Sequence, residues 1–311
     1  MEQTDPNTRQ DIAACLSYYH PPGSTFEVRL KGIKENKSEL WDHQWTSGPV
    51  SGYFNDITIA TNAIIRAEQE VQPDLIMMSI NSVPDDYLAR ANNRFRTDCP
   101  ALRDTDITHV DTILLDFDPL RKVPGVSATE KEKSKAQEAA MKFAHDAVAE
   151  GLPEPLISDS GNGYHVALKI PNIDVKEAKE IVKVFTEFAA DNYSNEFVKV
   201  DTTVTSPAHQ VRVIGTMNCK GENMPDRPHR RSKIISFPQT IQPIPIDRLV
   251  AIANEHNAKK AQDIAPPASR AIAHGAAKSA KFNLPAYLQH YSIHAVKVVP
   301  HGDSTLYEGL K

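Results

Sequence analysis

The chain has 311 residues, 40% of them hydrophobic, and a formal net charge of −5. These values are typical of a soluble globular protein of one large or two smaller domains. They exclude a polycationic chain, so any nucleic-acid surface must be a local patch. No apolar stretch approaches the ~18 residues that span a bilayer. The cysteines form no C-x-x-C pair, which argues against a zinc knuckle and favours a reducing compartment. We therefore expect a cytoplasmic protein that has no membrane partner.

The N-terminal third contains strand and helix patterns in turn. Residues 26–33 alternate apolar and polar side chains, as a half-buried strand does. Residues 57–71 carry apolar side chains at helical spacing, and residues 74–80 form a short apolar run that predicts another strand. Residues 85–96 are polar and rich in Arg and Asn, which indicates a helix or a loop.

A longer series of elements follows. Residues 110–118 are expected to form a buried strand, and residues 129–150 a charged helix that ends at Gly151. Strands that alternate with helices predict an α/β or α+β fold. After about residue 257 the composition becomes rich in Ala, Lys and Pro, which indicates a linker. The remaining predicted elements are strands at 155–158, 163–170, 198–201 and 210–214, and a helix at 175–193.

The strand over residues 110–118 ends in two carboxylates, Asp116 and Asp118. Because side chains alternate along a strand, both point to one face, and the apolar side chains of Ile113, Leu115 and Phe117 point to the other. Two adjacent anions repel each other, and a bound cation removes that cost. An all-oxygen pair suits Mg²⁺ or Mn²⁺. Taken alone, the pair leaves a solvated strand end equally open.

A second segment, residues 158–165, reads Ser-Asp-Ser-Gly-Asn-Gly-Tyr-His before a predicted strand. Its glycines and small polar residues allow backbone N–H groups to turn outward as an anion-binding nest. The imidazole of His165 would then lie near the mouth of this nest, where it could bind a phosphate oxygen. The nest residues are Ser160, Gly161, Asn162 and Gly163.

A third carboxylate and two groups of cations complete the pattern. Asp201 ends a strand that could lie beside the first, and three carboxylates on neighbouring strand ends would hold two divalent metals ~4 Å apart. Arg212 and Lys220 supply the positive charge that a triphosphate needs beyond its metals. The basic run after residue 226 is a candidate patch for a nucleic-acid backbone. It contains Arg227, Arg230, Arg231 and Lys233.

Taken in order, these segments resemble the motifs of the archaeo-eukaryotic primase superfamily. They are most similar to the primase-polymerases of phages, plasmids and integrated elements. The matching segments are LLDFDP (114–119), SGNGYH (160–165), VD (200–201) and RVIGTMNCKG (212–221), and the resemblance covers roughly residues 48–240. It implies that Asp116, Asp118 and Asp201 are catalytic ligands of two Mg²⁺ or Mn²⁺ ions. The implied nucleotide-binding residues are Ser160, Gly161, Asn162, Gly163, His165, Arg212 and Lys220.

The resemblance also implies an α/β (α+β) core of two mixed modules that meet at a cleft, one with an RRM-like antiparallel sheet. We expect this catalytic domain over residues 1–256, with an N-terminal module over about 1–104 and the motif-bearing module over about 105–245. A linker is expected over 257–281 and the start of a C-terminal accessory element over 282–311, as in the N-terminal part of a larger protein.

The implied activity is template-directed nucleotidyl transfer that synthesises primers during replication of a mobile element or phage, with primer extension left open. The implied partners are a single-stranded DNA template, NTP or dNTP, and a helicase or another replication protein. The sequence contains no P-loop of its own. Two alternatives remain. One is a non-catalytic replication-initiator module that binds DNA. The other is a haloacid-dehalogenase-like phosphatase, although Pro119-Leu120 stand where that family has Gly-Thr.

Overall fold

The computed structural model describes residues 6–33, 40–41, 50–264, 299–301 and 304–306. Contacts divide the chain into two compact units, residues 1–250 and 251–311. The described part of the second unit comprises most of helix α5 (Ile246–Ile264) and an antiparallel pair, β13 (Val299–His301) and β14 (Ser304–Leu306). Most of the expected linker and accessory element, residues 265–298, lies outside the described residues.

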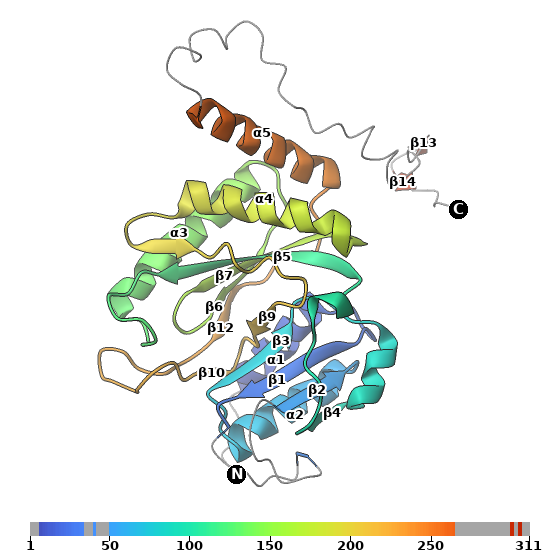
Figure 1. Cartoon of the computed structure of the whole chain (residues 1–311), viewed down its shortest axis with the longest axis vertical. Coiled ribbons are helices and arrows are strands. Elements are labelled where there is room, and N and C mark those ends of the chain that lie inside the picture. The colour runs from blue at the N-terminus through green and yellow to red at the C-terminus, as the bar shows by residue number, and fades with distance from the viewer. Residues whose placement is uncertain (1–5, 34–39, 42–49, 265–298, 302–303, 307–311) are drawn as a thin grey trace, which may run out of the picture. The chain divides into compact units, whose positions relative to one another are not determined.

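One five-stranded antiparallel sheet has the predicted RRM-like topology (Figure 1). Its core runs β5 (His109–Pro119), α3 (Glu130–Ala149), β6 (Leu156–Asp159), β7 (Tyr164–Asp174), α4 (Val175–Tyr193) and β8 (Val198–Val200). The spatial order β6-β7-β5-β8 is that of a β-α-β-β-α-β unit. Both helices contact β5 on one face of the sheet. The predicted α+β class with antiparallel sheets is therefore confirmed.

A second five-stranded antiparallel sheet is built mostly from the N-terminal third. Its strands are β1 (Phe26–Lys31), β2 (Val50–Phe54), β3 (Leu75–Ser79), β4 (Arg94–Arg96) and β9 (Gln210–Arg212), in the order β4-β2-β1-β3-β9. Strand β9 comes from the sequence range expected in the motif-bearing module, yet it pairs with β3. The chain therefore crosses from the RRM-like sheet to the N-terminal sheet after β8.

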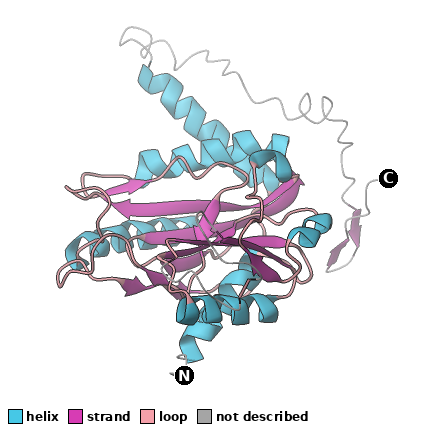
Figure 2. Cartoon of the chain, turned by 60° about the horizontal axis from the view of Figure 1, so that its bottom comes forward, coloured by secondary structure: helices cyan, strands magenta, loops and turns pink. Residues whose placement is uncertain are grey.

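Helix α1 (Pro6–Tyr19) and helix α2 (Ile57–Glu70) complete the first unit. The hydroxyl of Tyr18 donates to the carbonyl of Ala167 on β7 (2.8 Å), while Cys15 packs against the residues that follow β9. The apolar core includes side chains of both sheets, such as Phe26 and Leu114. Figure 2 shows the strands in the interior of this unit, with the helices outside them. The two sheets are thus joined by a continuous core rather than by a flexible linker.

Local signals explain the element boundaries. Asp56 caps α2 by accepting a hydrogen bond from Ile59 N (2.8 Å). Thr129 and Glu132 form a capping box at the start of α3, with reciprocal bonds of 3.2 and 2.9 Å. Gly151 has φ +81° and follows α3, as a C-terminal glycine is expected to do. No helix in the described ranges is long and apolar enough to cross a membrane.

The region after residue 216 differs from the sequence prediction. It forms a two-stranded pair, β10 (Met217–Asn218) with β11 (Arg230–Arg231), and then β12 (Lys233–Ser236), which pairs with β6 at the edge of the RRM-like sheet. The polar segment at 85–96 forms a short 3-10 helix, η1 (Asp85–Arg90), and strand β4, and a second short 3-10 helix, η2 (Asp104–Asp106), follows them. These elements are too short for periodicity to reveal, because only tertiary pairing makes them stable.

Candidate functional site

A cavity of about 440 Å³ lies between the two sheets. Leu114, Asp116 and Asp118 of β5 contribute to one wall, and residues of β3 and β9 form the opposite wall. The cavity is therefore built from segments that lie far apart in the sequence, from residue 74 to residue 220. Predicted site residues that line it are Asp116, Asp118, Ser160, Asn162, His165, Arg212 and Lys220.

The carboxylate pair occupies the position that strand alternation predicts. Asp116 and Asp118 line the cavity, while Leu115 and Phe117 are fully buried under the helices. In the register of the sheet, Asp116 lies opposite His165 on β7, and Asp118 lies opposite Lys199 on β8. The backbone of β5 thus sets the spacing of the two carboxylates. The neighbouring strands β7 and β8 determine which residues lie opposite them.

The electrostatics around Asp116 favour a cation. Burial raises the pKa of Asp116 well above its usual value, and repulsion from Asp118 and Asp201 raises it further. Its Oδ1 atom is buried and has no hydrogen-bond partner in the described part of the chain. Lys220 and Arg121 oppose the shift, and the guanidinium of Arg121 lies 3.6 Å from Asp118 Oδ1. An unbonded carboxylate oxygen beside a second carboxylate fits a divalent cation.

The third predicted ligand is less well placed. Strand β8 lies beside β5 as expected, and Asp201 N donates to Asp116 O (2.9 Å). However, both carboxylate oxygens of Asp201 accept hydrogen bonds from Thr203, at 2.9 and 3.0 Å, and Asp201 does not line the cavity. Across the described ranges, no group of three His, Cys, Asp or Glu side chains has a metal-holding arrangement. The residues present fit one cation on Asp116 and Asp118.

His165 lies beside the carboxylates and is uncharged at neutral pH. Burial above all, and nearby Arg212 and His209, together lower the pKa of His165 to about 3. Its Nε2 atom lies 3.7 Å from Asp116 Oδ1, and its Nδ1 atom is buried without a partner among the described residues. A neutral imidazole with an unused ring nitrogen can donate a hydrogen bond to a phosphate oxygen, which is the role expected from the sequence.

Arg212 and Lys220 bring positive charge to the cavity from the far wall. Arg212 Nη1 donates to the carbonyl of Met217 (2.7 Å), which fixes one arm of the guanidinium. Burial lowers the pKa of Arg212 to about 10, so the side chain stays charged at pH 7. Lys220 is exposed and lines the cavity rim. The cavity therefore brings Arg212 and Lys220 to the same space as Asp116 and Asp118.

The glycine turn has a different role from the predicted nest. Ser160 N donates to Gly163 O (3.0 Å), Gly161 N donates to Asp159 Oδ1 (2.8 Å), and Gly163 N donates to Ser160 Oγ (3.1 Å). These amides are already bonded within the turn and are not free to bind an anion. The nest interpretation is corrected on this point, because the small residues close the turn on itself. The turn instead presents the side chain of Asn162 to the cavity.

Close packing explains why the turn contains glycine. A Cβ atom on Gly163 would lie 2.6 Å from Phe117 O and 3.0 Å from Asp118 Oδ1. We expect Gly163→Ala to push β7 away from the carboxylate pair and to destabilise the fold by roughly 1–3 kcal/mol, measured by urea unfolding. Gly125→Ala is the matched control. It has φ +78° but nothing within 4 Å of a Cβ, so only backbone strain is added. Equal losses in both variants would contradict the steric explanation.

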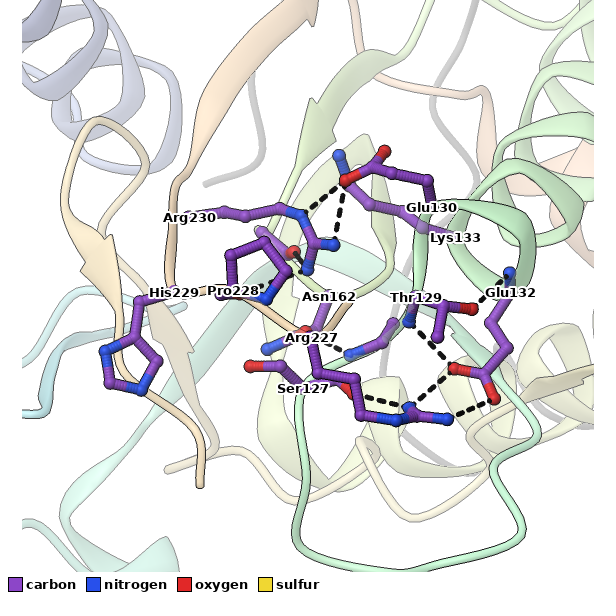
Figure 3. A network of polar contacts seen from close by, with 12 residues as sticks. Ser127, Thr129, Glu130, Glu132, Lys133, Asn162, Arg227, Pro228, His229 and Arg230 are labelled. Carbon is purple, nitrogen blue, oxygen red and sulfur yellow. Dashed lines mark hydrogen bonds and ion pairs between the residues drawn. The ribbon is translucent and has the colours of Figure 1, made fainter. Parts of the chain in front are cut away.

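The arginines of the basic run form ion pairs within the protein, and Figure 3 shows those of Arg227 and Arg230. Arg227 forms a bidentate pair with Glu132 on α3, at 2.8 and 3.0 Å. Arg230 pairs with Glu130 (2.8 Å), and Arg231 pairs with Glu68 on α2 (2.8 Å). Lys233 is exposed on edge strand β12. The three arginines therefore tie β11 and the loop before it to helices α2 and α3, and the nucleic-acid patch stays a prediction.

We expect Arg227→Ala to lower the melting temperature by a few degrees and to leave the salt dependence of single-stranded DNA binding unchanged, because its guanidinium is already paired. Thermal melts and binding titrations at several salt concentrations measure both effects. The matched control is the charge swap Arg227→Glu with Glu132→Arg, which should recover part of the lost stability. A shallower salt slope in Arg227→Ala would mean that this residue contacts a phosphate after all.

Several residues at the cavity were not assigned a role from the sequence. His209 and Gln210 line it from the end of the crossing segment, and Asn218 lines it from β10. Arg121 follows the carboxylate strand, and its side chain is only 9% exposed. Gln210 and Arg212 are two positions apart on β9, so their side chains lie on the same face of the strand. Only the unexpected pairing of β9 with β3 shows that this face meets the carboxylates.

Comparisons with known proteins add little to this geometry. No protein-family model matches the chain, and no curated protein matches it. Among solved structures, the crystal structure of primase RepB' matches with a TM-score of 0.43 and 12% sequence identity. The match covers 92% of this chain and 76% of that chain. At this level of similarity no residue role is transferred to this chain.

Proposed function

We propose that the chain is a primase-polymerase that catalyses DNA-templated nucleotidyl transfer. One observation carries the proposal: the carboxylate pair, the neutral His165 and the cations Arg212 and Lys220 line a single cavity. These groups match the parts of a metal-bound nucleoside triphosphate. The ordered motifs, which resemble those of the archaeo-eukaryotic primase superfamily, support the same activity independently of the geometry.

In this mechanism, Asp116 and Asp118 would hold Mg²⁺ or Mn²⁺. A divalent cation bound there supplies Lewis-acid activation of an attacking hydroxyl and neutralises the leaving pyrophosphate. Arg212 and Lys220 bind the triphosphate, and His165 donates a hydrogen bond to one phosphate oxygen. A second cation would require Asp201 to exchange its bonds to Thr203 for a metal bond.

The decisive experiment is a synthesis assay on unprimed single-stranded DNA with labelled NTPs or dNTPs, and with Mg²⁺ or Mn²⁺. We expect labelled chains whose sequence is complementary to the template. A protein that binds duplex DNA but neither binds nucleotide nor makes product in any of the four conditions would instead be a replication-initiator module. A primed template run in parallel separates a failure to initiate from a failure of nucleotidyl transfer.

A further inference from the structure

Two asparagines that line the cavity, Asn162 and Asn218, have no role in the proposed binding of the cation and the triphosphate. Each is more than nine-tenths buried, with exposed fractions of 4% and 5%, and both line the cavity. They come from different elements, the glycine turn and strand β10. Gly161 lies next to Asn218, because a Cβ on Gly161 would lie 2.8 Å from Asn218 Cβ. The two amides therefore flank the same short turn.

The backbone fixes the orientation of both amides. Asn162 Oδ1 accepts a hydrogen bond from Ala128 N (2.7 Å), and Asn218 Nδ2 donates one to Ser160 O (2.7 Å). Turning either amide over would set a donor against a donor or an acceptor against an acceptor. The remaining atoms are the donor Nδ2 of Asn162 and the acceptor Oδ1 of Asn218. Both are buried without a partner among the described residues.

The pair leaves one free donor and one free acceptor, and few ligand groups satisfy both. A deprotonated phosphate oxygen can only accept, so it cannot pair with Asn218 Oδ1. A metal ion would bind Oδ1 but leaves the Nδ2 donor of Asn162 unused. A hydroxyl group both donates and accepts, so it can satisfy both amides at once. A ligand that lacks the hydroxyl would leave both amide atoms buried and unpaired. Because unpaired buried polar groups cost free energy, such a ligand should bind less tightly.

A nucleobase edge also offers donors and acceptors, but a templated enzyme must accept all four bases. A fixed donor and acceptor that recognised one edge would exclude most of the others. Sugar hydroxyls are the same for every base. We infer that Asn162 and Asn218 together bind a ribose hydroxyl of the incoming nucleotide, and that the site therefore favours ribonucleotides over the analogue that lacks this hydroxyl. This inference rests on the proposed function.

The test compares the affinities of ATP, 2′-deoxy-ATP and 3′-deoxy-ATP for the full chain, measured by calorimetry with Mn²⁺ present. We expect ATP to bind about tenfold or more tightly than one of the two analogues, and the identity of that analogue tells which hydroxyl is bound. This measurement on the wild-type protein needs no variant. Equal affinities for all three nucleotides would overturn the inference. No binding of any nucleotide would overturn the proposed function as well.

Two variants then distinguish direct contact with the hydroxyl from a structural role of the asparagines. In Asn162→Ala and in Asn218→Ala, the affinity for ATP should exceed the affinity for the analogue that lacks the hydroxyl by no more than about threefold. In the double variant, the two losses should be more strongly coupled for ATP than for the analogue that lacks the hydroxyl, because that hydroxyl contacts both asparagines. A purely structural role would weaken binding of all three nucleotides alike and leave the preference intact, which contradicts the inference. Asn192→Ala, on exposed α4, is the matched control and should change nothing.

Discussion

Asp116→Asn is expected to reduce nucleotidyl transfer by roughly a thousandfold or more, because an amide cannot replace the charge that holds a catalytic cation. The same variant should be more stable than the wild type when no divalent cation is present. The pKa of Asp116 is raised in the folded protein, so the native state binds a proton more tightly than the unfolded chain does. That contribution to stability is complete below the unfolded pKa of about 4 and is lost as pH rises through the folded pKa.

At pH 7 the wild type therefore carries an electrostatic cost that Asn removes. Primer extension and thermal melts, with and without Mn²⁺, measure the two effects. Mn²⁺ should raise the melting temperature of the wild type and not that of Asp116→Asn. Asp111→Asn is the matched control on the same strand, because Asp111 pairs with Lys169 (3.0 Å). It should lower stability and leave transfer intact. If Asp116→Asn extends a primed template as well as the wild type does, the proposed function is wrong.

Arg212→Lys is expected to raise the KM for nucleotide by about tenfold to a hundredfold while changing kcat little. The arginine donates one arm to Met217 O and keeps the rest of its guanidinium for the cavity. A lysine has a single point charge and cannot serve both partners in this geometry. Steady-state kinetics over a range of NTP concentrations separate the two parameters.

The pH dependence of this variant gives a second readout. Burial lowers the pKa of Arg212 only to about 10, so wild-type KM should be constant across the neutral range. Burial favours the neutral form of a lysine too, and its pKa starts lower, so the KM of the variant should rise further as pH increases. Arg231→Lys is the matched control, because Arg231 pairs with Glu68 and does not line the cavity. An equal rise in KM in both variants would contradict a direct role for Arg212.

Much of the fold follows from local patterns in the sequence. The alternation in β1 and β5, the helical spacing of α2 and the capping signals of α3 depend on neighbours a few residues away, and they are found where the patterns indicate. The same local rule placed Asp116 and Asp118 on one face. The short strands β10, β11 and β12 were not predicted, because a strand of a few residues has no stability without its partner.

The basic run and the glycine turn show where a local pattern leaves more than one outcome open. A cluster of arginines is equally suited to phosphate groups and to carboxylates of the same chain. Which of them it meets depends on the distance to Glu68, Glu130 and Glu132 in the folded protein. Likewise, a glycine-rich turn can present its amides or bond them internally. The sequence of the turn does not distinguish these outcomes.

The sequence by itself determined the α+β class, the motif order and the identity of the carboxylates, since these depend on periodicity and residue chemistry along one segment. Only the tertiary structure decided that β9 joins the N-terminal sheet, which carries Arg212 across the cavity from Asp116. It also decided that both oxygens of Asp201 are bonded to Thr203 and that Asn162 and Asn218 each keep one polar atom without a partner among the described residues. The physical reason is that long-range pairing and burial depend on the whole packed chain.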